Sequence, residues 1–224
     1  MLTRGLLLED KLMNTTAQTN KFNETLKAEA PAYDVALTAE AGDGLTQYYE
    51  LLNLWNPRLH LVAPCSPREF ATRHVLESLV LLKHLPHGGS VADVGSGGGL
   101  PIIPCLIARP DLHAVLIESA QKKAVFLREA LTQTGIARQA NVIGERFENI
   151  PAPEVDFVTC RALERFEEML PHLFEWVPEK ATLLLFGAKR METGIENLGF
   201  SSTTELMPHS HGRFLFVVKN FGVR

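Results

Sequence analysis

A run of glycines between an apolar stretch and a helical segment constrains the fold of this chain more than any other feature. The run, Gly95-Ser96-Gly97-Gly98-Gly99, follows the short apolar segment 90–94. Residues 101–108 then read as a helix, since proline is tolerated in the first turn. A strand, a glycine turn and a helix in this order are typical of an α/β sheet that binds a ligand at the turn. A flexible turn without a ligand is the simpler alternative.

Strands and helices alternate after this turn. Further strands are expected at 114–117, 141–143, 155–159, 181–186, 202–207 and 213–219, and helices at 121–134, 164–176 and 190–198. Such alternation predicts a parallel sheet with right-handed crossovers, and the closing hairpin predicts one antiparallel strand. We therefore predict an α/β fold with a mostly parallel seven-stranded sheet, helices on both faces and an antiparallel final strand.

The chain before the sheet reads as helical. Residues 1–44 are expected to be a lead-in, partly helical or flexible, which ends in a turn at Gly42-Asp43-Gly44. Helical spacing then runs from Leu45 to Trp55, where Pro57 should limit the helix, and from Pro67 to Leu85. The expected regions are thus 1–44, a helical cap at 45–88, and a ligand-binding core at 89–224.

Composition narrows the class of protein. With 224 residues and 46% hydrophobic residues, the chain can bury a core without metal or disulfides. Three distant cysteines and no membrane-spanning or signal segment predict a cytoplasmic protein without a metal or a membrane partner. The net charge of −4 excludes a general nucleic-acid coat but allows a local basic patch. His209 and His211 could bind metal, although a polar turn explains them more simply.

The spacing of the glycines selects among ligands. A dinucleotide site needs a third glycine where the chain has Leu100, and no Gly-Lys-Ser/Thr follows to form a P-loop. The remaining common ligand is S-adenosylmethionine, whose amino-acid end needs exposed backbone and a nearby acidic group. Glu118 ends the next strand, about 20 residues on, where a carboxylate can accept hydrogen bonds from both ribose hydroxyls. A solvated carboxylate is the alternative.

Two further strand ends carry candidate residues. Phe147, after the third strand, could flank an adenine or simply anchor a surface turn. Arg161 follows the fourth strand, where a permanent cation suits a phosphate or a carboxylate. An ion pair with Glu164 or Asp93 is the alternative explanation.

The residues around Arg161 also restrict the reaction. The run Thr159-Cys160-Arg161-Ala162 lacks the Asn/Asp-Pro-Pro-aromatic sequence typical of exocyclic amine methylation. It also lacks the proline-flanked cysteine of cytosine C5 enzymes, so we interpret Cys160 as a small buried residue. A guanine N7 lone pair attacks a sulfonium methyl directly and needs only proximity and alignment. The sequence is compatible with that acceptor, and it identifies no catalytic acid or base.

Taken together, the motifs resemble the glucose-inhibited division protein B family of bacterial small-subunit ribosomal RNA guanine-N7 methyltransferases, over roughly residues 45–220. The matching segments are Trp55-Asn56, Arg73-His74-Val75-Leu76-Glu77-Ser78-Leu79, Gly95 to Pro104, Glu118-Ser119 with Lys122-Lys123, Arg146-Phe147-Glu148, and Cys160-Arg161-Ala162. The chain has Phe186 where the family has a lysine, and Lys189 or Arg190 lies nearby to replace it.

The resemblance implies a class I (Rossmann-like) methyltransferase with a helical N-terminal cap, which binds S-adenosylmethionine and small-subunit (16S) ribosomal RNA. It implies cofactor contacts at Gly95, Gly97, Leu100, Glu118, Phe147, Glu148 and Arg161. On the RNA side it implies Arg73, His74, Lys122 and Lys123. We expect a monomer. Two alternatives stay open: a small-molecule methyltransferase, and a non-catalytic RNA-binding domain on the same scaffold.

Overall fold

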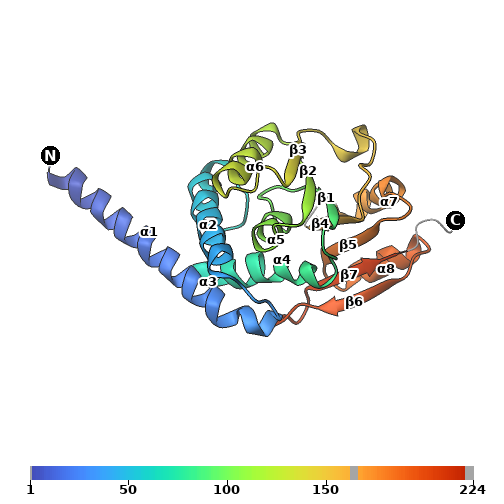
Figure 1. The fold of residues 1–224 in the computed structure, drawn as a ribbon, viewed down its shortest axis with the longest axis horizontal. Coiled ribbons are helices and arrows are strands. Elements are labelled where there is room, and N and C mark those ends of the chain that lie inside the picture. Colours follow the sequence, from blue (N-terminus) through green and yellow to red (C-terminus); the bar gives the residue numbers. More distant parts are fainter. Residues whose placement is uncertain (1, 162–165, 220–224) are drawn as a thin grey trace.

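A computed structural model describes residues 2–161 and 166–219. The predicted α/β architecture is confirmed (Figure 1). Within these ranges a seven-stranded sheet has the order β3-β2-β1-β4-β5-β7-β6. Its strands are β1 (Ser90–Val94), β2 (His113–Ile117), β3 (Ala140–Ile143), β4 (Phe157–Arg161), β5 (Thr182–Gly187), β6 (Ser202–Leu206) and β7 (Phe214–Val218).

The first five strands run parallel, and β7 is antiparallel to both of its neighbours, β5 and β6. The expected antiparallel final strand is therefore present, inserted between β5 and β6. Because β1 to β5 are parallel, their carboxyl ends meet at one edge of the sheet. A crevice at that edge is where open α/β sheets bind ligands.

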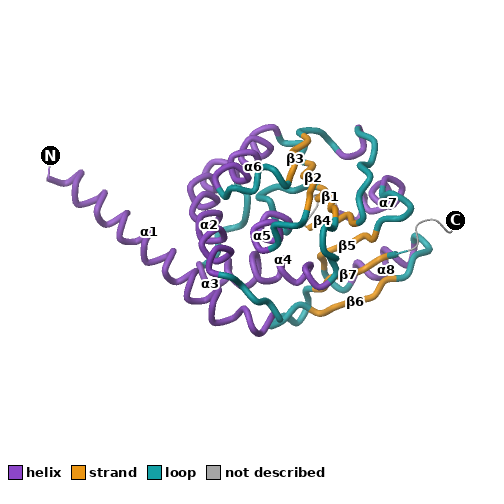
Figure 2. The backbone as a smooth tube through the Cα atoms, viewed as in Figure 1, coloured by secondary structure: helices purple, strands orange, loops and turns teal. Residues whose placement is uncertain are grey.

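Helices cover both faces of the sheet (Figure 2). Each face has its own apolar core. On one face lie α5 (Ile102–Ala108) and α6 (Gln121–Gln133), with the cap helix α2 (Ala39–Leu59) packed over them. On the other lie α7 (Phe166–Trp176) and α8 (Arg190–Asn197). The cap shares one continuous hydrophobic cluster with the sheet, to which Leu45, Tyr48 and Phe70 contribute.

The N-terminal part is more regular than expected. Helix α1 (Leu2–Glu29) leads into a 3-10 turn, η1 (Ala30–Tyr33), and its first half extends away from the body of the molecule (Figure 1). The chain then enters α2 behind the N-cap Thr38, whose side chain accepts a hydrogen bond from the backbone N–H of Ala41. Helix α2 thus runs across the boundary expected at residue 44.

The predicted turn at Gly42-Asp43-Gly44 is wrong, because these residues lie inside α2. A β-carbon on Gly44 would lie 2.8 Å from Cγ2 of Ile107, so the glycine lets α2 approach α5 closely. That packing offsets the cost of about 1 kcal/mol for a glycine in a helix. Pro57 does not end the helix either, since α2 continues to Leu59.

The segment expected as one helix from Pro67 to Leu85 is irregular. It comprises α3 (Pro67–Glu69), the π-helix η2 (Phe70–Leu76), α4 (Glu77–Leu79) and a 3-10 turn, η3 (Val80–Lys83). A π-helical turn frequently marks a functional site, and η2 carries Arg73 and His74.

The fourth strand is shifted from 155–159 to Phe157–Arg161. The carboxylate of Asp156 accepts hydrogen bonds from the backbone and hydroxyl of Ser90, so this residue forms a junction before the strand. Cys160 and Arg161 consequently end β4 instead of following it. The first residues of the helix expected at 164–176, and Glu164 with them, lie outside the described residues.

No helix within the described ranges is both long and apolar enough to cross a bilayer.

Candidate functional site

A cavity of about 500 Å³ opens at the carboxyl ends of the parallel strands. The glycine loop, the ends of β2 and β4, the segment after β3 and the cap all contribute to its walls. The lining residues include Leu61, Val62, Ala63, His74, Gly95, Gly97, Leu100, Glu118, Lys123, Arg146, Phe147, Glu148 and Arg161.

Four of the five backbone N–H groups of the glycine loop have hydrogen-bond partners within the protein. The N–H groups of Gly95 and Ser96 both donate to the Ile117 carbonyl, at 2.9 and 3.1 Å. Gly97 N–H donates to Oε2 of Glu118 at 2.8 Å, and Gly99 N–H donates to the Ser96 carbonyl at 2.6 Å. A loop that cradles phosphate would direct such donors at its ligand. This loop is therefore unsuited to a pyrophosphate.

Glu118 links the loop to the start of α6. Its second carboxylate oxygen, Oε1, accepts a hydrogen bond from Ala120 N–H at 2.8 Å, and the residue is 7% exposed. The carboxylate is thus fixed in place at the cavity wall, and its unused lone pairs can accept bonds from hydroxyl groups. The alternative of a solvated, unconstrained carboxylate is excluded.

Asp93 is an acidic group that the sequence analysis did not assign to the site. It lies in β1 two residues before the loop, is fully buried, and neither of its carboxylate oxygens has a hydrogen-bond partner among the described residues. Burial, together with the charge of Glu118, raises the pKa of Asp93 to about 8. A carboxylate in an apolar strand just before a glycine loop was the available signal.

The acidic groups and the bonded loop indicate which ligand suits the cavity. Two buried acidic groups lie next to the loop, Glu118 in the cavity lining and Asp93 outside it. Four of the five backbone N–H groups of the loop, those of Gly95, Ser96, Gly97 and Gly99, already have partners. Such a site favours a ligand that is cationic and rich in donors, with an ammonium group and ribose hydroxyls. The residues present therefore fit S-adenosylmethionine better than a dinucleotide.

Arg161 reaches the opposite wall and is held from several sides. Its guanidinium donates to the Arg73 carbonyl at 2.6 Å and to the Ser78 hydroxyl at 3.3 Å. It lies 3.6 Å from the carboxylate of Glu77 and 5.4 Å from the ring centre of Phe186. The alternative explanation, an ion pair between Arg161 and an acidic residue, is correct in kind, with Glu77 as the acidic partner among the described residues. Asp93 is not that partner, and Glu164 lies outside the described residues.

Glu77 is itself a buried residue that the sequence analysis did not assign a role. It is 1% exposed and also accepts a hydrogen bond from Nε of Arg213, at 2.7 Å. Burial raises its pKa, while the charge of Arg161 opposes that change. Because its carboxylate lies 3.6 Å from the guanidinium, Glu77 helps to hold Arg161 in place. Loss of either partner of such a buried ion pair lowers stability strongly.

The cap supplies a third wall through residues 61–63. The side chain of Asn56 donates to the Val62 carbonyl at 3.1 Å and accepts from Val62 N–H at 3.0 Å. This paired contact ties the segment to the end of α2. Trp55 packs against Phe126 of α6, with ring centres 5.9 Å apart, and holds the same end of α2 against the core.

The structure brings most of the predicted site residues together. All seven expected cofactor residues line the cavity, as do His74 and Lys123. Phe147 is 5% exposed and packs edge-on against Trp176, so it anchors the turn as well as lining the cavity. Arg73 and Lys122 lie outside the lining. The side chain of Arg73 is 46% exposed and pairs with Glu69.

Burial and the nearby charges of Arg161 and Arg73 lower the pKa of His74 to about 3. His74 is therefore neutral at ordinary pH and a poor proton acceptor. Cys160 is fully buried, as expected. Lys189, a candidate to replace the family lysine, pairs with Glu192 at 2.6 Å and is 63% exposed.

No cluster of three or more His, Cys, Asp or Glu side chains that could hold a metal occurs in the described part of the chain. His209 lies 5.9 Å from the ring of Tyr33 and 3.8 Å from Glu29, which fits a turn residue.

The chain is similar to known proteins in both sequence and fold. The protein-family model described as "GidB: rRNA small subunit methyltransferase G" matches residues 42–215. A protein named ribosomal RNA small subunit methyltransferase G from Nitrosomonas eutropha is 41% identical over 141 residues, which are 61% of this chain and 65% of that protein. One of the same name from Sorangium cellulosum is 36% identical over 178 residues, 76% of this chain and 72% of that protein. The match thus spans just under two thirds of the Nitrosomonas protein.

Solved structures share the fold at low identity. A SAM-dependent methyltransferase from Aquifex aeolicus has a TM-score of 0.55 at 16% identity, over 76% of this chain and 97% of that one. The mitomycin 7-O-methyltransferase MmcR has a TM-score of 0.58 at 14% identity, over 89% of this chain and 67% of that one. The sheet order and the glycine loop agree with this Rossmann-like methyltransferase fold. The family match over residues 42–215 shows that the chain belongs to the GidB family, described as rRNA small subunit methyltransferase G.

Proposed function

We propose that this protein is an S-adenosylmethionine-dependent methyltransferase that modifies N7 of a guanine in small-subunit (16S) ribosomal RNA. The observation that carries the proposal is the cavity in which the glycine loop, Glu118 and Arg161 meet. Family membership supplies the substrate class. We further propose that the protein acts as a monomer in the bacterial cytoplasm. None of its three cysteines forms a disulfide.

Each wall of the cavity has a role in this proposal. S-adenosylmethionine, when bound, supplies a methyl group activated by a sulfonium. Glu118 accepts hydrogen bonds from the ribose hydroxyls, and Phe147 lies beside the base. Gly95, Gly97 and Leu100 let the amino-acid end approach the backbone, near Asp93. Arg161, fixed by Glu77, presents a permanent cation to a phosphate or a carboxylate.

The acceptor assignment rests on the weak basicity of the histidine among the described residues that line the cavity. His74 is the histidine that lines it, and its pKa of about 3 makes it a poor proton acceptor. Methylation of a hydroxyl or an amine requires loss of a proton, whereas guanine N7 carries a lone pair at neutral pH. The site therefore needs only to align the base with the methyl group.

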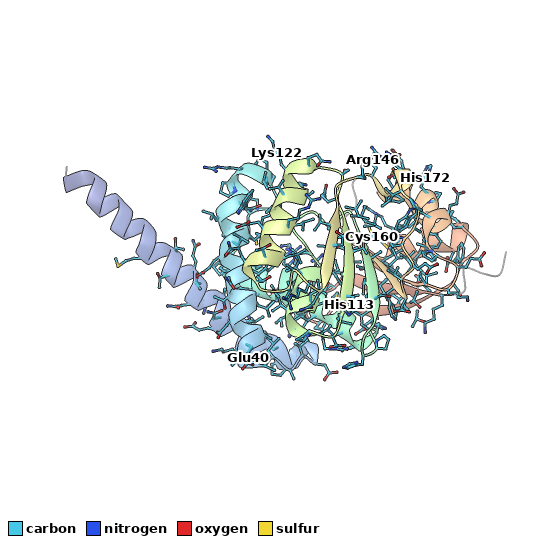
Figure 3. The ribbon with its side chains drawn as sticks, turned by 45° about the horizontal axis from the view of Figure 1, so that its top comes forward. Glu40, His113, Lys122, Arg146, Cys160 and His172 are labelled. Atoms are coloured by element: carbon cyan, nitrogen blue, oxygen red, sulfur yellow. The ribbon has the colours of Figure 1, made fainter. Side chains whose placement is uncertain are left out.

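Basic residues lie along the same edge of the sheet. Figure 3 places Lys122 and Arg146 at this edge, while His113, at the start of β2, lies toward the opposite end. Lys122 and Lys123 form a local basic pair that can neutralise RNA phosphates despite the net charge of −4. Arg146 is already paired with Glu148, at 2.8 Å.

The test is to map N7-methylguanosine in small-subunit RNA by reduction and aniline cleavage. We expect one site that is lost when the gene is deleted and restored by the wild-type protein. The Gly97→Val variant should not restore it. Unchanged modification in the deletion strain would overturn the proposal. Transfer of labelled methyl groups to a small molecule instead would establish a small-molecule methyltransferase. Cofactor binding without transfer to any acceptor would indicate a non-catalytic RNA-binding domain.

A further inference from the structure

The cap helix α2 contacts the glycine loop through a buried tyrosine. Tyr48 is fully buried, and its hydroxyl donates a hydrogen bond of 2.5 Å to the carbonyl of Gly98, a residue 50 positions away in the chain. Burial raises the pKa of Tyr48 far above its usual range, so the hydroxyl keeps its proton and acts as a donor. The bond therefore joins the cap helix α2 to the glycine loop, which are far apart in the sequence.

Packing alone does not require this hydroxyl. The ring of Tyr48 lies 6.5 Å from that of Phe70 in the core that the cap shares with the sheet, where a phenylalanine would fill nearly the same space. A buried hydroxyl costs free energy unless it has a partner. The Gly98 carbonyl is that partner, so the polar atom of Tyr48 is directed at the loop.

The contact fixes a particular peptide group. The Gly98 carbonyl belongs to the peptide that joins Gly98 to Gly99, next to Gly97 at the cavity wall. A β-carbon on Gly98 would lie 3.4 Å from Cβ of Leu61 and 3.5 Å from Cδ1 of Leu52, so cap residues also pack directly against the loop. The loop is thus held by Ile117 and Glu118 on the sheet side and by Tyr48 on the cap side.

We propose that Tyr48 is a positioning residue for the cofactor loop, so that affinity for S-adenosylmethionine depends on the helical cap as well as on the sheet. The inference rests on the proposed function, because it assumes that the loop binds this cofactor. Tyr48 does not line the cavity and acts through the Gly98–Gly99 peptide. Its loss should weaken cofactor binding without changing the chemical step.

Tyr49 provides a matched control. It lies next to Tyr48 on the same helix and is 4% exposed, but its ring stacks on Phe22 at 4.3 Å, away from the loop. Tyr49→Phe removes a neighbouring hydroxyl from the same cap. A general loss of stability in the cap should raise the cofactor Kd in both variants. A specific effect on the loop should raise it only in Tyr48→Phe.

The experiment measures S-adenosylmethionine affinity by calorimetry for the wild type, Tyr48→Phe and Tyr49→Phe. The loss of one hydrogen bond predicts a rise in Kd of about two- to tenfold for Tyr48→Phe and none for Tyr49→Phe. The KM for the cofactor should rise by a similar factor, with kcat at saturating cofactor unchanged. Hydrogen exchange at the Gly97 and Gly99 amides should also accelerate in Tyr48→Phe alone.

Two results would overturn the inference: a wild-type Kd in Tyr48→Phe, or an equal rise in Kd in both variants. A wild-type protein that fails to bind S-adenosylmethionine would instead defeat the proposed function. The two failures are therefore distinguishable.

Discussion

Gly97 has a backbone conformation that side chains rarely adopt. Its φ is +52°, and its N–H donates to Glu118 at 2.8 Å. A β-branched residue at such an angle is strained and would move the peptide away from Glu118. We expect Gly97→Val to lower S-adenosylmethionine affinity by more than about tenfold, by calorimetry, while far-ultraviolet circular dichroism shows that the fold is retained.

Gly199 offers the matched control for that substitution. It has a φ of +83° at the end of α8, with open space around its β-carbon position. Gly199→Val imposes similar backbone strain away from the cavity. It should lower stability to a comparable degree and leave the cofactor Kd unchanged. An unchanged Kd in Gly97→Val would refute the role assigned to the loop.

His74 should make stability depend on pH in a defined direction. Its pKa is about 3 in the folded protein, against about 6.5 when unfolded. Between these values the unfolded state binds more protons, so stability is lost as the pH falls below about 6.5. The contribution is at most about 2 kcal/mol between pH 7 and pH 5. Urea unfolding of the wild type and His74→Gln at both pH values measures it.

The expected result is a smaller difference between the two pH values in His74→Gln than in the wild type. Other buried groups also make stability depend on pH, among them the carboxyls of Glu77 and Asp93, whose pKa values are raised by burial. Both proteins contain these groups, so the comparison isolates His74. Equal pH dependence in the two proteins would contradict the lowered pKa.

At the scale of elements, the end of α2 holds the cavity wall formed by residues 61–63. Asn56 makes two hydrogen bonds to the backbone of Val62, and alanine at position 56 would lose both. We expect Asn56→Ala to cost about 1–3 kcal/mol of stability and to raise the cofactor Kd several-fold. Asn53→Ala, an exposed position one turn earlier, is the control and should leave the Kd unchanged. Thermal unfolding and calorimetry would test both variants.

The elements that sequence alone predicted are those with strong local patterns. The apolar β1 and the glycine turn after it carry their own signal, and both appear where expected. The start of β4 was misplaced by two residues because Asp156 bonds to Ser90, a contact made across the sheet. The helical conformation of Gly44 was missed because its close packing on Ile107, distant in sequence, outweighs the local preference of glycine.

In the candidate site, too, residues with a local sequence pattern could be predicted, and residues whose role depends on distant contacts could not. Gly97, Glu118 and Arg161 could be found because each lies at a strand end, and parallel strands bring those ends together. Tyr48 and Glu77 could not be assigned, since their periodicity is that of ordinary core positions. Their roles follow from polar partners far away in the chain, the Gly98 carbonyl and Arg161. No local pattern encodes such a pairing.

For the whole molecule, the distribution of charge matters more than its sum. The chain carries a net charge of −4, yet Lys122 and Lys123 lie at the cavity edge of the sheet. Phosphate binding by these lysines would release counterions and make RNA affinity fall with salt. We expect Lys122→Ala with Lys123→Ala to weaken RNA binding and flatten the slope of log K against log salt by about 1 to 2, with cofactor affinity nearly unchanged.

The control removes the same charge from the opposite end of the sheet. Arg138 and Lys180 are exposed and precede β3 and β5, so they lie at the amino ends of the strands. Replacing both with alanine should leave the salt slope of RNA binding as in the wild type. An identical slope in the Lys122 and Lys123 variant would show that those lysines are merely solvated.

The internal bonding of the glycine loop has a thermodynamic consequence. The N–H groups of Gly95, Ser96, Gly97 and Gly99 and the Gly98 carbonyl have partners before any ligand arrives, so the loop gives up little conformational entropy on association. Binding to a site that is already ordered should not show the additional negative heat-capacity change that accompanies coupled folding and binding. The heat-capacity change should therefore match burial of the ligand alone, and the association rate should not be limited by a slow closing step.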